Sequence, residues 1–218
     1  MGWPEENDDM KAFFPGDLLE TGGDILFFWV ARMVMMSLTF TDKLPFHTVY
    51  LHPMVRDEEG QKMSKSKGNV IDPLEVTDGC TLDVLLSKLD ASTLTENEKK
   101  KGKNNKKKDF PNGIVPCGTD ALRMTLLSYM TQSTINLNVK QVEGYKEFCN
   151  KLWQMVRFAL MQFPANWTPR PKGVKGIEKQ LSMTDKWILT RLSKLIESTN
   201  DNFNNFKLGE MIQNLFDF

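Results

Sequence analysis

A polar stretch at residues 61–70, with the sequence QKMSKSKGNV, concentrates three lysines, two serines and a glycine. It follows a segment that reads as a strand (49–56) and a turn cluster (57–60), so we expect a mobile loop after a strand. Lysine is a compact charge on a flexible stem, and serine hydroxyl and backbone N–H groups add neutral donors, which together suit phosphate oxygens. A solvated surface loop has the same composition, so composition alone leaves both interpretations open.

The order of residues in this loop is more specific than its composition. Residues 62–66 read KMSKS, which is letter for letter a signature of the class I aminoacyl-tRNA synthetases. Other segments resemble the valyl branch of that family, in the expected order and over nearly the whole chain: 3–6, 19–33, 68–73, 118–123 and 148–153. The sequence GGDILFFW at 22–29 favours the valyl over the isoleucyl branch.

The chain contains no segment like HIGH, the other signature of this family, and no editing domain. We therefore expect a part of such an enzyme, inactive by itself, that begins within the catalytic domain and ends within the anticodon-binding domain. The alternative is a non-catalytic RNA- or partner-binding module derived from a class I synthetase. Titration with tRNA at several salt concentrations separates the two, because an RNA-binding module shows a steep salt dependence.

The resemblance implies that the whole enzyme uses ATP and Mg²⁺ to activate valine and then transfers valine to tRNA(Val). The carboxylate of valine attacks the α-phosphate, so the protein supplies positioning and charge stabilisation rather than a nucleophile. The resemblance assigns Lys62 and Lys65 to the β- and γ-phosphates as pyrophosphate leaves. The other expected ATP contacts are Met63, Ser64 and Ser66 in the loop and the backbone of Met54 and Val55 before it.

A second group of candidate residues lies upstream. By resemblance, Gly22 and Asp24 contact the ribose of the adenylate, although an acid in a first helical turn also interacts with the helix dipole without binding a ligand. Ile25 and Trp29 are one helical turn apart and, by resemblance, line the pocket for the isopropyl group of valine; core packing is the alternative. Such a pocket discriminates weakly between small side chains. His52 is interpreted as a structural histidine without a role in proton transfer.

The elements around these residues predict an α/β fold. Residues 18–19 begin a strand that leads into Gly22, residues 24–39 form an apolar and therefore buried helix, and residues 46–55 form a second strand. Two strands around a helix predict a parallel unit, the second half of a doubly wound nucleotide-binding (Rossmann-like) domain. Residues 2–17 read as a loop.

Lysines dominate residues 99–108, within a polar segment at 93–109. Such a segment buries too little apolar surface to fold alone, so we predict a solvated, disordered loop. Contact with tRNA phosphates is the functional alternative. By resemblance, the length of the connection from 79 to 118 indicates a eukaryotic cytosolic enzyme.

The remaining pattern is helical. A turn begins at Pro73, and the periodicity predicts helices at 82–89, at 119–130 with Thr119 as cap, and at 142–163, ending at Pro164 with its apolar residues in the core. A linker at 164–180 precedes a helix capped at 184–185 and another at 208–216, which form an α-helical bundle. The expected domains are 1–78 (catalytic, with the KMSKS loop), 79–140 (insertion and connecting helix) and 141–218 (start of the anticodon-binding domain).

Composition excludes several classes of protein. The 28 basic and 28 acidic residues balance, which argues against a dedicated nucleic-acid coat. Cys80, Cys117 and Cys149 show no CxxC spacing and there are two histidines, so we expect neither a disulfide framework nor a metal site. The apolar run 25–38 is interrupted by Arg32 and reads as too short to span a membrane. We expect a soluble, monomeric, cytoplasmic protein, with mitochondria as a further location.

Overall fold

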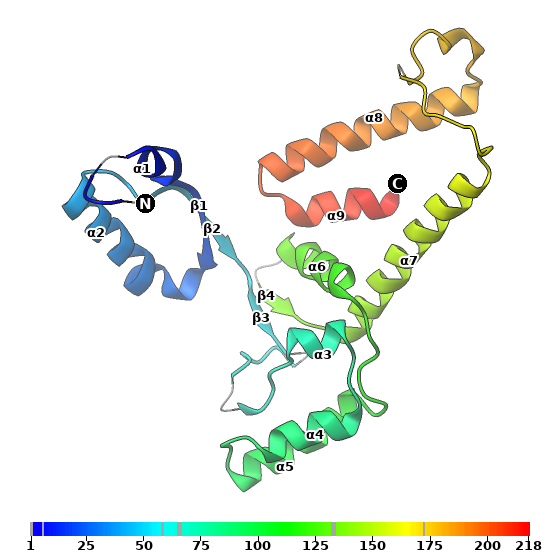
Figure 1. Cartoon of the computed structure of the whole chain (residues 1–218). Coiled ribbons are helices and arrows are strands. Elements are labelled where there is room, and N and C mark those ends of the chain that lie inside the picture. Colours follow the sequence, from blue (N-terminus) through cyan, green and yellow to red (C-terminus); the bar gives the residue numbers. More distant parts are fainter. Residues whose placement is uncertain (1, 6, 58, 65–66, 132–133, 172) are drawn as a thin grey trace. The chain divides into compact units, whose positions relative to one another are not determined.

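The computed structural model describes residues 2–5, 7–57, 59–64, 67–131, 134–171 and 173–218. The chain forms two compact units, Met1–Met54 and Val55–Phe218, whose elements are labelled in Figure 1.

The first unit is built on two parallel strands. Its elements, in chain order, are α1 (Asp8–Phe13), β1 (Gly16–Gly22), the turns η1 (Gly23–Ile25) and η2 (Leu26–Val30), α2 (Ala31–Thr41) and β2 (Phe46–His52). Strands β1 and β2 pair in parallel from Gly16↔Phe46 to Gly22↔His52. The structure thus confirms the predicted parallel strand–helix–strand unit.

Two predictions for this unit are wrong. Residues 2–17 are not simply a loop, because α1 forms there with Asn7 as its cap; the Asn7 side chain accepts a hydrogen bond of 2.9 Å from the Met10 amide. The apolar segment after Gly22 is not a buried helix either. Within η1, η2 and α2 only Val30 is buried, and Phe27 is 87% exposed. Two strands offer too little surface to cover a helix that is apolar on every side.

The segment Gly23–Thr41 has 19 residues and is, by length and composition, long and apolar enough to cross a membrane. This differs from the expectation that the apolar run is too short. A core helix of a soluble protein passes the same test, so the finding is weak evidence for a membrane span.

The second unit is mostly helical. In chain order it contains β3 (Met54–Arg56, which begins at the end of the first unit), α3 (Pro73–Thr77), α4 (Leu82–Asp90), α5 (Glu96–Asp109), α6 (Thr119–Ser128), η4 (Tyr129–Thr131), β4 (Thr134–Asn136), α7 (Val139–Met161), η5 (Glu178–Gln180), α8 (Met183–Asn204) and α9 (Leu208–Asp217). Strand β3 pairs with β4. The core lies where α3, α4, α6, β4 and the start of α7 meet, with Val76, Leu85, Ile135 and Val142 almost fully buried.

The lysine-rich segment forms helix α5, so the prediction of a disordered loop is wrong. A capping box begins the helix: the Glu98 amide donates to the Thr95 hydroxyl (3.4 Å), and the Glu98 carboxylate accepts from the Thr95 amide (2.9 Å). Lys99 donates to the carbonyl of Asp90 (3.1 Å), and Lys103 pairs with the Asp90 carboxylate (2.5 Å). These lysines face α4, and their contacts replace the apolar face that the sequence lacks.

We expect replacement of Thr95 by alanine to loosen the first turn of α5, at a cost of about 1 kcal/mol. Hydrogen bonds from the side chain and backbone of Thr95 lower the pKa of Glu98. A lowered pKa stabilises the folded state above the ordinary pKa of the carboxyl group, and the stabilisation disappears as pH falls through the lowered value. The protection of amides 96–99, which is their exchange rate relative to the intrinsic rate at the same pH, should therefore fall in acid in the parent chain and depend less on pH in Thr95→Ala. If the pH dependence at 96–99 is the same in the parent chain and in Thr95→Ala, or if the control Thr93→Ala changes it equally, the Thr95–Glu98 capping box is not its cause.

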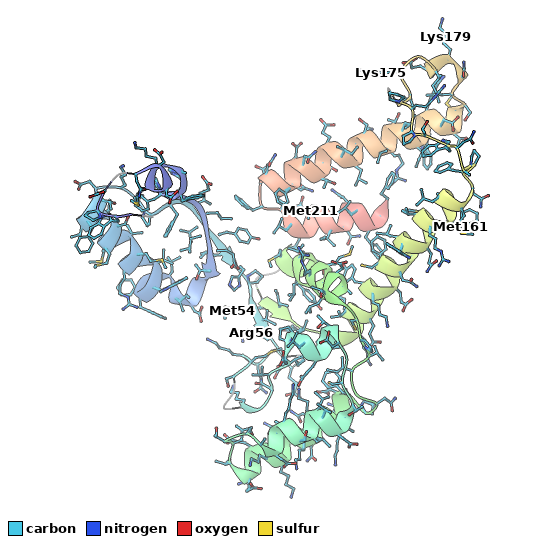
Figure 2. All side chains as sticks on the ribbon, in the orientation of Figure 1. Met54, Arg56, Met161, Lys175, Lys179 and Met211 are labelled. Atoms are coloured by element: carbon cyan, nitrogen blue, oxygen red, sulfur yellow. The ribbon has the colours of Figure 1, made fainter. Side chains whose placement is uncertain are left out.

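The C-terminal helices form as predicted, with corrections to their caps and packing. Gly118 rather than Thr119 is the N-cap of α6, and Ser182 caps α8 in a capping box with Asp185. The apolar seam of α7 is buried only in its first half, at residues such as Val142 and Phe148. The second half, which ends at Met161 (Figure 2), is exposed; Trp153, for example, is 70% exposed.

Candidate functional site

Gly22 lies at the end of β1, where the backbone approaches two side chains of its own unit closely. A Cβ atom at this position would lie 2.8 Å from the sulfur of Met54 and 2.9 Å from the Asp24 carboxylate. Both distances are shorter than a methyl group tolerates, so only glycine fits here without a shift of these neighbours. The structure therefore brings together three of the predicted site residues, Gly22, Asp24 and Met54, at the carboxyl end of a parallel strand.

Ile25 and Trp29 follow directly, but not in a regular α-helix. Ile25 ends the 3₁₀ turn η1, and Trp29 lies in η2, which is a π-helical turn. The assumption of α-helical spacing between them is wrong, because the chain passes through two other turn types before α2 begins. Such π turns often occur at functional sites. The half-buried Ile25 and the exposed Trp29 remain predicted pocket residues.

His52 ends β2 and has two neighbours that orient its ring. Its Nε2 atom lies 3.3 Å from the carboxylate of Glu20, on the paired strand, and Nδ1 lies 3.1 Å from the carbonyl of Pro53. Both ring nitrogens are thus used in local contacts, which supports the interpretation of His52 as a structural residue.

The loop with the lysine signature, residues 61–70 (the signature loop), belongs to the second unit and is held at its base by Asn69. The side-chain oxygen of Asn69 accepts from the Ser64 amide (3.0 Å), and its amide group donates to the Asp57 carboxylate (2.8 Å) and the Lys62 carbonyl (3.4 Å). Asp57 in turn accepts from the Gln61 amide (2.7 Å). One side chain thus connects both limbs of the loop.

Two apolar side chains, one within the loop and one directly after it, attach the loop to the core of the second unit. Met63 and Ile71 both pack against the buried cluster, as does Val55 before the loop. Met63, which the resemblance assigns to ATP, therefore has a packing role, while Lys62 is exposed and Ser64 is half-buried. Lys65 and Ser66, the other two signature residues, lie outside the described residues.

A pocket of about 490 Å³ lies between the signature loop and α5. Residues of the loop, including Lys67 and Asn69, line one side, and residues of α5, including Lys101 and Lys106, line the other. Both acidic and basic side chains surround this pocket, so its charge does not select an anion. Its lining shows instead that the loop and α5 border the same pocket.

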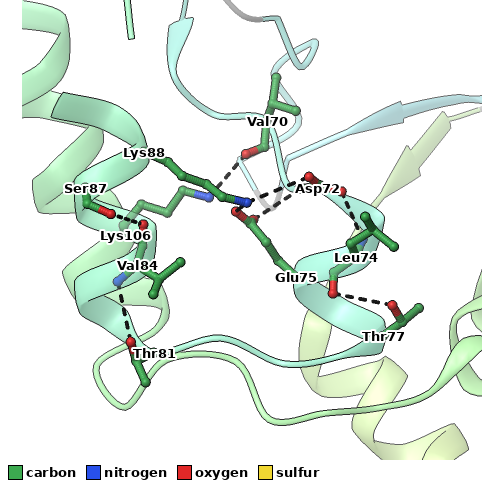
Figure 3. Close-up of polar contacts among 10 residues, drawn as sticks. All are labelled: Val70, Asp72, Leu74, Glu75, Thr77, Thr81, Val84, Ser87, Lys88 and Lys106. Atoms are coloured by element: carbon green, nitrogen blue, oxygen red, sulfur yellow. Dashed lines mark hydrogen bonds and ion pairs between the residues drawn. The ribbon is translucent and has the colours of Figure 1, made fainter. Parts of the chain in front are cut away.

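Lys106, on α5, forms a side-chain hydrogen bond with the loop. Its side chain is buried, and its ammonium group donates to the carbonyl of Val70 at 3.2 Å (Figure 3). Burial lowers the pKa of Lys106, and the nearby charge of Glu75 partly offsets the decrease. Sequence reasoning did not single out Lys106, although Lys99, Lys103 and Lys106 recur with helical spacing.

A second lysine reaches the segment that follows the loop. Lys88, on α4, pairs with the buried carboxylate of Glu75 at 2.8 Å and lies 3.8 Å from the carboxylate of Asp72 (Figure 3). The hydrogen bond with Glu75 and the charge of Glu75 raise the pKa of Lys88. Helix α3, whose capping box joins Asp72 and Glu75, is thereby connected to α4.

These side chains suit phosphate chemistry better than metal binding. The described part of the chain contains no group of three His, Cys, Asp or Glu residues placed to hold a metal ion. A loop that presents cations, hydroxyl groups and backbone amides provides donors for phosphate oxygens. Cys80, Cys117 and Cys149 are free thiols, and burial raises the pKa of each, so none is an activated nucleophile.

Comparison with known proteins agrees with this chemistry. The chain is 50% identical over 204 residues to a valine–tRNA ligase of Homo sapiens and 48% identical over 217 residues to a mitochondrial valine–tRNA ligase of Arabidopsis thaliana. These matches cover 93% and 99% of the chain but only 16% and 19% of the relatives. The chain therefore spans less than a fifth of the length of these relatives. A mitochondrial enzyme matches as fully as the human one, so the match does not single out a eukaryotic cytosolic type.

A solved structure shows the class of fold. It is the ternary complex of LeuRS from Agrobacterium radiobacter K84 with tRNA and LeuAMS, and it matches 93% of this chain and 22% of its own with a TM-score of 0.59 and 18% identity. The chain thus has the fold of part of an aminoacyl-tRNA synthetase. The model of the family described as tRNA synthetases class I (I, L, M and V) matches residues 1–140, and the chain belongs to this family.

Proposed function

We propose that this chain is the part of a valine–tRNA ligase that contains the second ATP-binding signature and the start of the tRNA-binding helices. The main support is the identity of about half of its residues to valine–tRNA ligases over more than nine-tenths of the chain. The intact KMSKS sequence at 62–66 and the close packing around Gly22 agree with it.

In this proposal the signature loop stabilises the departing pyrophosphate. Lys62 and Lys65 neutralise charge on the β- and γ-phosphates while the carboxylate of valine attacks the α-phosphate. Ser64, Ser66 and backbone amides add donors to the same oxygens, and the backbone of Met54 and Val55 contacts adenine. The loop gains this ability from its attachment at Asn69 and Met63, which limits where its cations can lie.

The first unit supplies the other groups. Asp24 and Gly22 contact the ribose, and the close approach at Gly22 supports this role, because a side chain there would displace the carboxylate. Ile25 and Trp29 form the wall for the isopropyl group of valine. A wall of this kind rejects a smaller or isosteric side chain by only about 1 to 3 kcal/mol, so editing elsewhere in the enzyme is required.

Mg²⁺ fits the proposal as part of the nucleotide substrate. The described residues form no carboxylate cluster for it, and proteins commonly hold Mg²⁺ through substrate phosphates with few protein ligands. When bound, the ion neutralises phosphate charge together with the lysines. ATP, valine and tRNA(Val) are the proposed partners of a monomeric enzyme in the cytoplasm, with mitochondria as a further location. The functional domains are proposed at 1–78, 79–140 and 141–218, where a helical bundle binds tRNA.

The test is a chimera in which this chain replaces the matching stretch of the human valine–tRNA ligase. We expect the chimera to exchange pyrophosphate into ATP in a valine-dependent reaction, and to do so much more slowly with isoleucine. A thermal melt of the chimera and its human parent shows whether both are folded. A folded chimera without exchange, or with equal exchange for valine and isoleucine, would contradict the proposed function.

A further inference from the structure

The signature loop is packed against a helix that sequence reasoning treated as disordered, and the contact between them is specific. Helices α4 and α5 form a hairpin, Leu82–Asp109 (the α4–α5 hairpin). Gly68 has a left-handed backbone (φ +66°), and a Cβ atom there would lie 2.8 Å from Leu94 and 3.1 Å from Leu89. The loop backbone therefore lies directly on the hairpin.

The hairpin also approaches the loop at Gly102. A Cβ atom on Gly102 would lie 3.3 Å from Leu89 and 3.7 Å from the carbonyl of Gly68. Glycine is unfavourable inside a helix by roughly 1 kcal/mol relative to alanine. At this position α5 therefore lies tightly against Leu89 of α4 and in van der Waals contact with the backbone of the loop.

Lys106 provides the polar part of the contact. Only 7% of Lys106 is exposed, its ammonium group donates to the Val70 carbonyl, and it lies 5.7 Å from the centre of the Phe110 ring. Among the described residues no carboxylate forms an ion pair with Lys106. Burying a cation without such a partner costs free energy. The packing of the surrounding fold must therefore hold Lys106 in place, with its ammonium group against the Val70 carbonyl.

We propose that the α4–α5 hairpin sets the position of the signature loop, and that Lys106, through its hydrogen bond to the Val70 carbonyl, is the positioning residue. The inference deepens the proposed function, on which it rests for its catalytic consequence. Lys88 completes the arrangement by fixing α3, which follows the loop, through Glu75 and Asp72. The second limb of the loop is thus held at Val70 and again two residues later.

The positional part is tested on the 218-residue chain by hydrogen–deuterium exchange. In Lys106→Met, which keeps the apolar stem but removes the donor, amides at 61–71 should exchange faster while those of α6 and α7 are unchanged. In Lys106→Arg, which keeps a donor, the loop amides should exchange at rates closer to those of the parent chain. In the control Lys107→Met, on the exposed side of α5, they should exchange at the same rates as in the parent chain. Unchanged exchange in the loop, or faster exchange spread over α6 and α7, would overturn the proposal.

The catalytic consequence is tested in the chimera. Lys106→Met should lower kcat for pyrophosphate exchange about 10- to 100-fold, because small displacements of catalytic groups are costly, and should leave KM for valine unchanged. Lys106→Arg should restore part of the rate. An unchanged kcat together with a mobile loop would overturn the role in positioning for catalysis. An inactive parent chimera would contradict the proposed function instead, while hydrogen exchange would still decide whether Lys106 positions the loop.

Discussion

Replacement of Lys65 by alanine in the chimera is expected to slow formation of valyl-adenylate by a factor of about 10² to 10³, equivalent to about 2.7 to 4 kcal/mol. The reason is that negative charge accumulates on the departing pyrophosphate, and a cation opposite that charge is most effective in the transition state. Valine itself carries no group that Lys65 must contact, so its affinity should be nearly unchanged. Single-turnover adenylate formation at saturating ATP measures the first quantity and equilibrium valine binding measures the second.

Two further variants separate charge from position in this experiment. Lys65→Arg keeps the charge and should lose less activity, although a planar guanidinium group does not follow a moving phosphate as a compact ammonium group does. Lys100→Ala removes a charge from the exposed side of α5 and should have no effect. A loss of valine affinity in Lys65→Ala as large as the loss of rate would mean that Lys65 acts in ground-state binding or in structure.

The local fold around the candidate site was predictable because its signals are local. The strand that ends at Gly22, the strand that begins at Phe46 and the helical turn at Pro73 follow from alternation, apolar runs and capping residues. The strand predicted at 46–55 is, however, two strands in the structure, β2 and β3, which belong to different sheets. The KMSKS order predicts the loop independently of any periodicity. These features depend on residues within a few positions of one another, which is the range that pattern analysis covers.

The features that were missed depend on distant contacts. A run of lysines is solvated if nothing binds it, but Asp90 binds Lys99 and Lys103, and Val70 accepts from Lys106, 36 positions away. Composition cannot indicate these partners. The spacing of 99, 103 and 106 with Gly102 between them was a usable signal, because it places three cations and a close-packing glycine on one face of a helix.

The exposed apolar faces of α7 and α8 also show that a helix's own sequence does not identify its partners. Periodicity correctly predicts helices at α7 and α8, yet for α7 it predicts burial of the whole apolar face. In the structure only the first half of α7 packs on the core, and no described residue of α8 is buried. A hydrophobic face shows that a covering surface is favourable, but the sequence of the helix does not specify where that surface is.

Replacement of Asn69 by aspartate is expected to lower the rate of adenylate formation about 10- to 100-fold, because it removes a charge-assisted hydrogen bond worth about 1.5 to 3 kcal/mol and adds repulsion. Asn69 donates to the Asp57 carboxylate at 2.8 Å, so the substitution places two carboxylates in contact. Its orientation is fixed by the network, since the side-chain oxygen accepts from the Ser64 amide. The loop should then move away from Asp57, with KM for valine unchanged in the chimera.

The exchange of both partners distinguishes a lost contact from a general loss of stability. The double substitution Asp57→Asn with Asn69→Asp restores one donor and one acceptor across the same gap, and the acceptors for the Ser64 and Gln61 amides remain. It replaces the weaker 3.4 Å bond to the Lys62 carbonyl with a contact between two acceptor oxygens, which costs part of the gain. Most of the activity should therefore return in the double variant, whereas Asp57→Asn alone leaves two amide groups facing each other and should be less active than the double variant. The double variant restores a donor and an acceptor between positions 57 and 69. If it is nevertheless no more active than Asn69→Asp, the hydrogen bond between Asp57 and Asn69 does not hold the loop in its active position.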